Sequence, residues 1–286
     1  MYIIMYVKKL TQITIFLTFI LINLGGYVHN TGSSLACPDW PLCFGQFMPK
    51  MTGGVLFEHS HRLLGSLVGF LTLIIMVSLR KNDRFKFTGR LLLAIVIAQG
   101  LLGGLTVIFK LPPLVSTAHL ALSMFFICKL IQLDHLLEAK ATNKAEAYFS
   151  HALLLGLILV YAQIIWGALI RHLGLGTICG IGNEHILWCH GKLLPPSGLE
   201  QFHMGHRCLA FIASTALAVP NIILIRKSGL RQNYLSLIVI LLIPIQILLG
   251  FMTVETRGIR PSVTMFHLTG ATLLLSTNWK IYLKGK

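Results

Sequence analysis

The segment that decides the fold is VLFEHSHRLLGSLVGFLTLIIMVSL, residues 55–79. Its length and apolar composition suit a transmembrane helix, which needs roughly 20 mostly apolar residues. Near one end, however, it carries Glu58, His61 and Arg62. Ionisable side chains are costly inside a membrane and usually face the interior of a helix bundle, where they are paired or functional. The segment therefore predicts a transmembrane helix with a polar site near one end.

Further apolar runs flank this segment on both sides. They predict seven more spans, at about 10–28, 90–109, 114–134, 150–170, 201–225, 233–252 and 262–281. The chain is 55% hydrophobic and 12% charged, and that charged fraction is about half of what a soluble domain carries. We expect the first span to be retained, because it is long enough to cross a membrane and lacks a convincing cleavage site. The sequence predicts an all-α integral membrane protein with eight transmembrane helices.

The net charge of +15 is spread over short segments between the spans. Fifteen Lys and Arg residues lie on the side that holds both termini, and six lie on the other side. Because short cytoplasmic loops carry an excess of basic residues, we expect both termini in the cytoplasm. This distribution does not favour nucleic-acid binding. We expect the plasma (inner) membrane of a prokaryote and not a mitochondrial membrane, because the chain is short and shows no segment resembling a transit peptide.

An internal repeat relates the two halves of the chain. The corresponding pairs are Gly25 and Gly167, Cys37 and Cys179, His61 and His206, and His119 and His267, at offsets that grow from 142 to 148 residues. Ordered recurrence of rare residues indicates repeated structural units. We therefore predict two parallel repeats of four helices, residues 1–145 and 146–286.

Four histidines lie within the predicted spans, about six residues from the outer end of each: His61, His119, His206 and His267. At a rise of 1.5 Å per residue, all four lie roughly 8–9 Å deep. A single histidine would suit an interhelical hydrogen bond, but two per half at matched depth favour a cofactor between facing helices. Two imidazoles suit axial ligation of a haem iron. A non-haem zinc or iron site that adds Glu58 or His203 is the alternative.

Glu58 distinguishes the two halves. It lies three residues before His61 and shares its helix face, whereas the corresponding residue of the second half is His203. An acid beside only one of two similar sites suggests that the first site performs chemistry and the second passes electrons. The alternative is that Glu58 only pairs with Arg62 or with a loop group.

Basic residues near the outer ends of the spans are candidate anion ligands. Arg62 and Arg207 each follow a histidine, and Arg suits bidentate binding of carboxylates such as haem propionates. Snorkelling of these side chains to lipid headgroups is the alternative. His29 and Arg171 follow the first and fifth spans at equivalent places and could bind the same anions.

Two cysteine pairs lie in the outer loops, Cys37 with Cys43 and Cys179 with Cys189. In an oxidising compartment, cysteines at short separation favour disulfides. We expect structural bridges in both loops, and a redox role of the first pair is the alternative.

The first outer loop resembles that of the haem A synthase family. Its sequence is His29-Asn30-Thr31-Gly32-Ser33-Ser34-Leu35-Ala36, followed by Cys37-Pro38-Asp39-Trp40-Pro41-Leu42-Cys43. Glu58-His59-Ser60-His61-Arg62 resembles the Glu-x-x-His-Arg signature of that family, and the other three histidines fall at its haem-binding positions. The resemblance covers essentially the whole chain. His29 stands where the family usually has Arg or Lys.

The resemblance implies two four-helix bundles related by pseudo-twofold symmetry. It also implies oxidation of the C8 methyl of haem O to a formyl group, by successive hydroxylations with water-derived oxygen, to supply haem A to terminal oxidases. By the same resemblance, His61 and His119 hold the substrate haem O, and His206 and His267 ligate a haem b cofactor. Glu58 is then the catalytic acid, which takes up a proton or stabilises positive charge beside the porphyrin. A haem O synthase is the implied source of the substrate.

Two other functions would use the same histidines. A di-haem b electron carrier resembling cytochrome b561 needs the four histidines but neither Glu58 nor the Cys-Pro-Asp-Trp loop. A transporter with parallel repeats would use the histidines to carry protons, and the arginines after His61 and His206 do not favour it. Membrane lipid is the expected surrounding. A homo-oligomer and a monomer both stay open.

Overall fold

The computed structural model describes residues 2–138, 150–180, 188–256 and 260–285. In these residues all regular secondary structure is helical, in eight helices, and the only β pairing consists of two isolated bridges. The chain divides into two compact units, Met1–Lys140 and Ala141–Lys286, here called unit 1 and unit 2. The predicted boundary between residues 145 and 146 lies outside the described residues.

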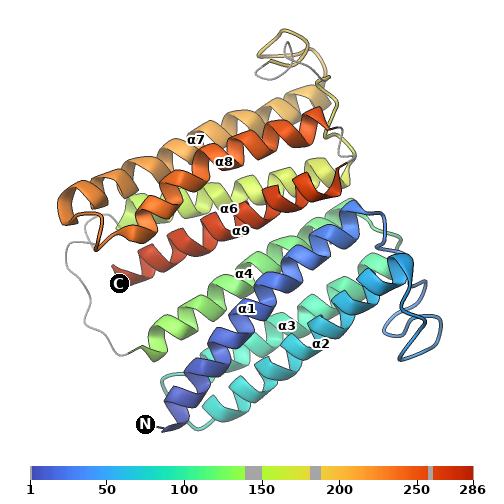
Figure 1. Cartoon of the computed structure of the whole chain (residues 1–286), viewed down its shortest axis with the longest axis vertical. Coiled ribbons are helices and arrows are strands. Elements are labelled where there is room, and N and C mark those ends of the chain that lie inside the picture. Colours follow the sequence, from blue (N-terminus) through green and yellow to red (C-terminus); the bar gives the residue numbers. More distant parts are fainter. Residues whose placement is uncertain (1, 139–149, 181–187, 257–259, 286) are drawn as a thin grey trace. The chain divides into compact units, whose positions relative to one another are not determined.

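Unit 1 is a ring of four helices, each contacting the next. The helices are α1 (Tyr2–Asn30), α2 (Gly53–Leu79), α3 (Lys86–Ile108) and α4 (Pro113–Leu137). Contacts join α1 to α2, α2 to α3, α3 to α4, and α4 back to α1. Helices α2 and α4 therefore lie diagonally opposite each other, and successive helices run in opposite directions (Figure 1). The loop 31–52 links α1 to α2 and is called loop 1.

Unit 2 has the same order of contacts. Its helices are α6 (Ser150–His172), α7 (Gly198–Ser228), α8 (Tyr234–Glu255) and α9 (Pro261–Lys284). Contacts join α6 to α7, α7 to α8, α8 to α9, and α9 back to α6. Here α7 and α9 are the diagonal pair. The segment 173–197, called loop 2, links α6 to α7.

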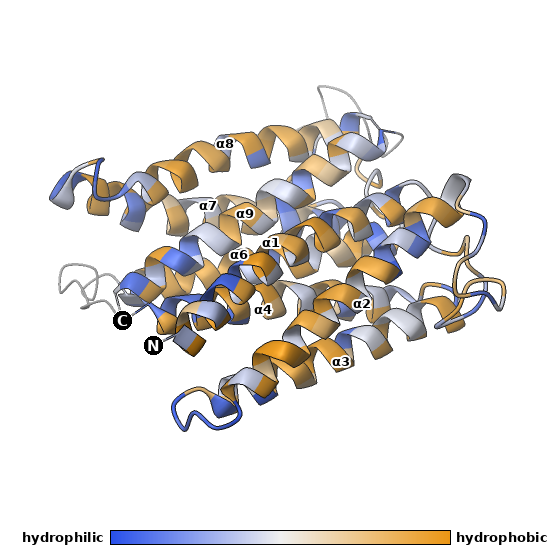
Figure 2. Ribbon diagram, turned by 60° about the horizontal axis from the view of Figure 1, so that its bottom comes forward, coloured by the Kyte–Doolittle hydropathy of each residue, from blue (hydrophilic) through white to orange (hydrophobic). Residues whose placement is uncertain are grey.

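Seven of the eight described helices are long and apolar enough to cross a membrane. The prediction of an all-helical, multi-pass membrane protein is confirmed. The exception is α9, which includes His267, Asn278 and Lys280. That α9 also crosses the membrane stays a prediction. Figure 2 shows apolar residues along the helices and hydrophilic residues in the connecting turns. The pseudo-twofold relation between the two units also stays a prediction.

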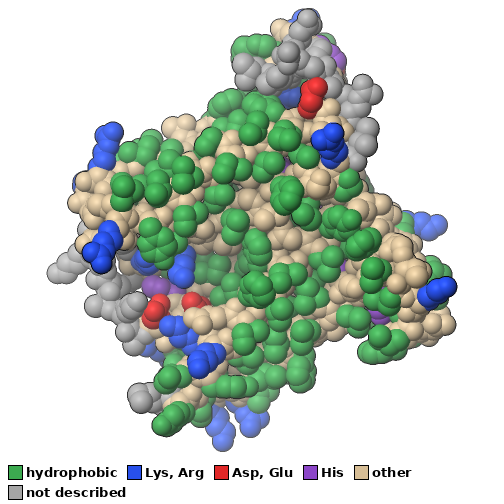
Figure 3. All heavy atoms as spheres, viewed as in Figure 1, with side chains coloured by type: hydrophobic (Ala, Val, Ile, Leu, Met, Phe, Trp, Pro, Cys, Tyr) green, Lys and Arg blue, Asp and Glu red, His purple; other side chains and the backbone are tan. Residues whose placement is uncertain are grey.

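Large apolar side chains cover the outward faces of the helices (Figure 3). Phe16, Phe70 and Ile97 are each more than half exposed, which suits contact with lipid tails. Inside unit 1, the contiguous core is formed by the N-terminal part of α1, the C-terminal part of α2, the segment 85–95 that includes the start of α3, and the C-terminal part of α4. All of these segments lie in the half of the unit remote from loop 1. The half next to loop 1 contains the predicted site.

Candidate functional site

The four predicted ligand histidines lie on the diagonal helices of their units. In unit 1 His61 is on α2 and His119 is on α4, while in unit 2 His206 is on α7 and His267 is on α9. Diagonal helices face each other across the interior of a four-helix ring. The two imidazoles of each unit lie within electrostatic range of one another. Each unit therefore brings one histidine pair together.

A glycine of the preceding helix lies against each of these imidazoles. A Cβ atom built on Gly25 of α1 would lie 2.8 Å from Cε1 of His61, and one on Gly167 of α6 would lie 2.8 Å from Cε1 of His206. The corresponding distances are 3.2 Å from Gly103 to His119 and 3.4 Å from Gly250 to His267. Real Cβ atoms almost never come closer than 3.0 Å. The first two rings therefore occupy space that only glycine leaves open.

The four glycines also lie at the same depth. Gly25, Gly103, Gly167 and Gly250 each stand five residues before the end of their helix, at Asn30, Ile108, His172 and Glu255. Five residues of α-helix correspond to roughly 7.5 Å along the axis. The two units thus build the same histidine–glycine contact twice each, near the ends that carry loops 1 and 2.

The histidines have the chemistry that a haem iron requires. In each of the four rings Nδ1 is buried and makes no hydrogen bond within the described residues. Buried polar atoms usually have a hydrogen-bond partner, so four buried Nδ1 atoms without one, on rings at matched depth, call for a ligand in the two sites. Neutral imidazole is a common metal ligand, and the facing pairs could hold one haem in each unit.

Glu58 and Arg62 join loop 1 to α2. The Glu58 carboxylate is 4% exposed. Its Oε2 accepts the backbone N–H of Cys37 at 2.7 Å, and its Oε1 accepts Nη2 of Arg62 at 2.6 Å. Arg62 also donates to the carbonyl oxygens of Asp39, Leu42 and Cys37. The pairing of Glu58 with Arg62 and a loop group, which the sequence left as an alternative, is present here, and the propionate role of Arg62 stays a prediction.

Asp39 stabilises the tight turn of loop 1. Its carboxylate accepts the backbone N–H groups of Phe44 at 2.6 Å and Gly45 at 2.8 Å. The hydrogen bond from Gly45 is the main reason that the pKa of the Asp39 carboxyl lies below its ordinary value, with further lowering by Phe44 and by the charge of Arg62. Asp39 therefore stays ionised under mildly acidic conditions, and the turn keeps its two hydrogen bonds.

Trp40 of loop 1 packs against α3. A Cβ atom on Gly104 would lie 2.8 Å from the Trp40 ring, so the indole packs directly against this glycine. Gly104 adjoins Gly103, on which the His119 ring lies. The loop thus covers the end of unit 1 beside the predicted site, which the sequence did not indicate.

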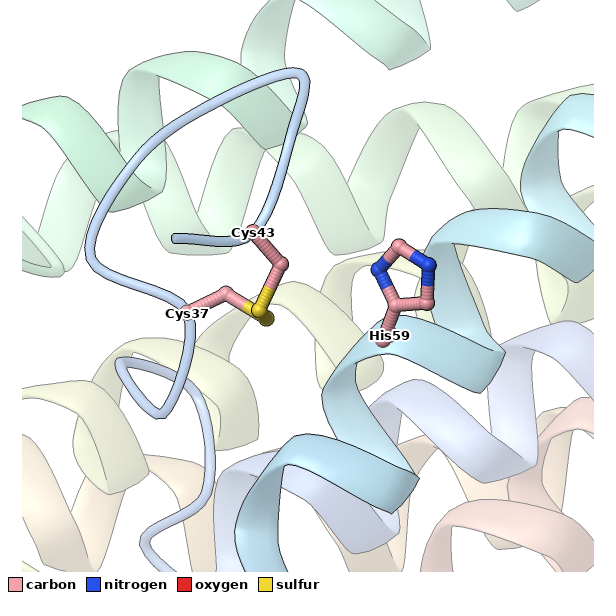
Figure 4. Close-up of side chains that lie close together, drawn as sticks. All are labelled: Cys37, Cys43 and His59. Carbon is pink, nitrogen blue, oxygen red and sulfur yellow. A yellow bond between two sulfur atoms is a disulfide. The ribbon is translucent and has the colours of Figure 1, made fainter. Parts of the chain in front are cut away.

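His59 lies beside the disulfide of loop 1. Cys37 and Cys43 are bonded, and the His59 ring faces them from α2 (Figure 4). Nε2 of His59 lies 3.0 Å from the Phe47 carbonyl oxygen, and the tautomer sets which atom donates. One histidine nitrogen and the two sulfur atoms lie within 4.8 Å of one another. Sulfur atoms bonded to each other are not thiolates, which are the form that binds metals, so these residues do not form a metal site.

Unit 2 has different residues around its loop. Cys179 and Cys189 form a disulfide, and Met204 of α7 packs against both sulfur-bearing residues. His203, at the position of Glu58, is buried, and its Nδ1 makes no hydrogen bond within the part of the chain described. Arg207 follows His206 on α7.

The two remaining anion candidates lie at helix ends. His29 is in the last turn of α1, and Arg171 is in the last turn of α6. The propionate contacts predicted for Arg207, Arg171 and His29 stay predictions.

Asp134 is a second buried acid that the sequence analysis did not single out. It is 9% exposed and accepts Nε2 of Gln12 at 3.0 Å. It lies near the C-terminal end of α4, whereas His119 lies near its start. Glu58 is therefore the one buried acid beside the histidines among the described residues.

The chain is similar to proteins of known family. A family model described as cytochrome oxidase assembly protein, COX15-CtaA, matches residues 8–278. A heme A synthase of Geobacillus kaustophilus is 29% identical over 259 residues, covering 85% of this chain and 80% of that protein. Heme A synthases of Shouchella clausii and Bacillus mycoides are 27% and 26% identical, covering 94% and 88% of this chain and 93% and 85% of their own lengths.

Proposed function

Because the chain belongs to the COX15-CtaA family of cytochrome oxidase assembly proteins, we propose that it is a haem A synthase. The proposed reaction oxidises the C8 methyl of haem O to a formyl group by successive hydroxylations, with oxygen derived from water. The four electrons removed would pass by way of the haem b of unit 2 to an electron acceptor outside this chain, and the four protons would be released to solvent. The similarity to heme A synthases over most of the chain supports this reaction. The observation that carries the proposal is that a buried acid, Glu58, lies on the same helix face as His61 in unit 1, whereas the corresponding residue of unit 2 is His203.

We assign the substrate haem O to His61 and His119 of unit 1. A cofactor haem b, which supplies one-electron redox chemistry when bound, is assigned to His206 and His267 of unit 2. Each imidazole would hold an iron, and the glycine beside it keeps the ring in place. Arg62, Arg207, Arg171 and His29 are proposed to lie near the propionates.

Glu58 is the proposed catalytic residue. Each of its oxygens already accepts one hydrogen bond, and a carboxylate has about four acceptor sites. Glu58 can therefore take up a proton or stabilise positive charge that develops on the substrate while it still holds loop 1. A fixed negative charge in a site that excludes water is effective at this.

We further propose that the protein lies in a plasma membrane with α9 as its eighth span and both termini in the cytoplasm. Haem O would be received from a haem O synthase. Loops 1 and 2 then face the oxidising side, where their disulfides are stable.

The test is the Glu58→Gln variant, expressed together with a haem O synthase. Glutamine keeps a hydrogen-bond acceptor for the Cys37 N–H but cannot accept a proton. We expect haem A formation to fall by roughly 10²–10⁴-fold, the usual range for a general acid or base, while haem O and haem b stay bound. Chromatography of extracted haems and the Soret band measure both quantities.

Asp134→Asn is the matched control, because it removes a buried acid of unit 1 remote from the histidines. We expect it to make haem A at the normal rate. Normal haem A production by Glu58→Gln would disprove the catalytic role of this residue. A protein that binds haem b alone, with neither haem O nor haem A, would instead be an electron carrier.

A further inference from the structure

Each predicted ligand histidine packs against a glycine of the preceding helix. The residue four positions before that glycine is the same in three of the four helices and different in the fourth. In three of the four helices it is glutamine: Gln99 before Gly103, Gln163 before Gly167, and Gln246 before Gly250. In α1, before Gly25, it is Leu21. Residues four apart lie on one helix face, so each glutamine points toward the same neighbouring helix as its glycine.

Two of the glutamines bind the backbone of the histidine itself. Nε2 of Gln99 donates to the carbonyl oxygen of His119 at 2.8 Å. Nε2 of Gln163 donates to the carbonyl oxygen of His206 at 3.0 Å and lies 3.3 Å from its ring Nε2. These bonds join the helix that carries the glycine to the helix that carries the histidine, at the level of the imidazole.

The third glutamine packs against the histidine's helix without such a bond. A Cβ atom on Gly270 of α9, three residues after His267, would meet Nε2 of Gln246. Gly270 is therefore needed for the Gln246 side chain to lie in place. His61 is the one histidine of the four with no glutamine beside it.

Hydrogen bonds to the ring of a ligating histidine fix its orientation, and their loss typically weakens metal binding by about 10–100-fold. A bond to the backbone of the same residue fixes the helix that carries the ring, and we expect an effect at the lower end of that range. A cofactor that stays bound through many turnovers benefits from two fixed ligands. A substrate that must enter and leave is released more readily where one ligand lacks such a bond.

We propose that Gln99 and Gln163 are positioning residues for His119 and His206, and that Leu21 leaves the His61 backbone without such a bond, so that the substrate haem exchanges at His61. This inference rests on the proposed function, which assigns haem O to unit 1. It explains why the two units share the histidine–glycine contact but differ in the residue one turn before the glycine.

The experiment exchanges the two residue types between units. Leu21→Gln adds the missing amide to unit 1, and Gln163→Leu removes the amide from unit 2. Purified protein carrying haem O and haem b is mixed with excess apomyoglobin, and the two transferred haems are separated by chromatography over time. We expect Leu21→Gln to slow haem O release by about 10-fold, and Gln163→Leu to speed haem b release by about 10-fold. Gln99→Leu should speed haem O release.

A spectroscopic readout separates positioning from general loss of packing. The electron paramagnetic resonance signal of oxidised low-spin haem b depends on the orientation of its two imidazoles. We expect Gln163→Leu to shift or broaden this signal. Gln132→Leu on α4, which only removes a bond to Lys129, is the control and should change neither the signal nor either rate.

The outcomes distinguish this inference from the function on which it rests. Wild-type protein that carries haem b but never haem O would overturn the proposed function. Wild-type protein that carries both haems, with release rates in Leu21→Gln and Gln163→Leu within about twofold of normal, would overturn the positioning role alone. Leu21→Gln stays informative if Gln163→Leu fails to fold, because it adds a bond instead of removing one.

Discussion

The loop-bearing ends of the two units are held together by different interactions. In unit 1 the buried ion pair of Glu58 and Arg62 ties the backbone of loop 1 to α2. In unit 2 the disulfide of loop 2 packs against Met204, and His203 replaces the acid. Directly beneath, both units place imidazoles on glycines in the same way. Two repeated units can therefore keep the same histidine–glycine contacts while the residues next to their loops differ. Unit 1 has a buried ion pair there, and unit 2 has a disulfide packed against a methionine.

Among the variants that test this difference between the units, we expect Arg62→Met to lower the free energy of unfolding most, because it leaves Glu58 buried without its charged partner. Breaking a buried ion pair costs about 3–5 kcal/mol, and the loop also loses its carbonyl contacts. Unfolding in detergent, followed by circular dichroism, measures the change. Arg90→Met, on an exposed part of α3, should stay within about 0.5 kcal/mol of the wild type. Equal stabilities for the two variants would mean that the ion pair does not hold loop 1.

Alanine substitutions at the glycines that contact the imidazoles are expected to lower haem affinity by a smaller amount, which depends on how close the new Cβ atom comes to the ring. Gly25→Ala and Gly167→Ala bring a Cβ atom to 2.8 Å from an imidazole, whereas Gly250→Ala leaves 3.4 Å. Overpacking of this kind costs about 1–3 kcal/mol, so we expect the first two variants to lose haem affinity and Gly250→Ala to lose little. Haem titration followed at the Soret band measures the affinities. Gly69→Ala, with open space around it, is the control, and a uniform loss at all positions would contradict the steric explanation.

Acidification is expected to have the smallest effect, and it should change only the stability of the turn in loop 1. The pKa of Asp39 is lowered in the folded protein, so its contribution to the turn is present above the ordinary carboxyl pKa and is lost as pH falls through the lowered value. We expect reduction of the Cys37–Cys43 disulfide by a phosphine to stay slow from about pH 7 to 4 and to accelerate below that. In Asp39→Asn it should be fast throughout. The Cys179–Cys189 disulfide is the internal control, and an identical pH profile for both bridges would rule out Asp39 as the cause.

The helices and the histidines could be predicted because each depends on local chemistry. Apolar runs mark the part of a helix that lies in hydrocarbon, so the spans were found, but their ends were not. α1 begins at Tyr2, eight residues before the predicted 10, and α7 ends at Ser228, three residues after the predicted 225. Lys8 and Lys9 interrupt the apolar run of α1, although the apolar residues 2–7 continue the helix. At the end of α7 the polar residues 226–228 continue the helix, and hydropathy gives no signal there.

The contacts around the histidines could not be predicted in the same way. Gly25 and His61 are 36 residues apart, and only the register between α1 and α2 shows that they meet. Glycine is common in transmembrane helices, so Gly25 alone carries no signal. The repeated spacing of glutamine four residues before Gly103, Gly167 and Gly250 was visible in the sequence. It would have been a usable signal once the repeat was known.

The largest described hydrophobic cluster of unit 1 lies in the half of the bundle remote from loop 1. The stability of such a bundle depends on what fills its other half, next to loop 1. Any molecule that binds only the folded state shifts the folding equilibrium away from unfolding. If haem fills the half next to loop 1, as proposed above, that half would unfold more often in a cell short of haem. Membrane proteases would then cleave it more often. The lifetime of the chain would then follow the supply of the molecule that it is proposed to modify.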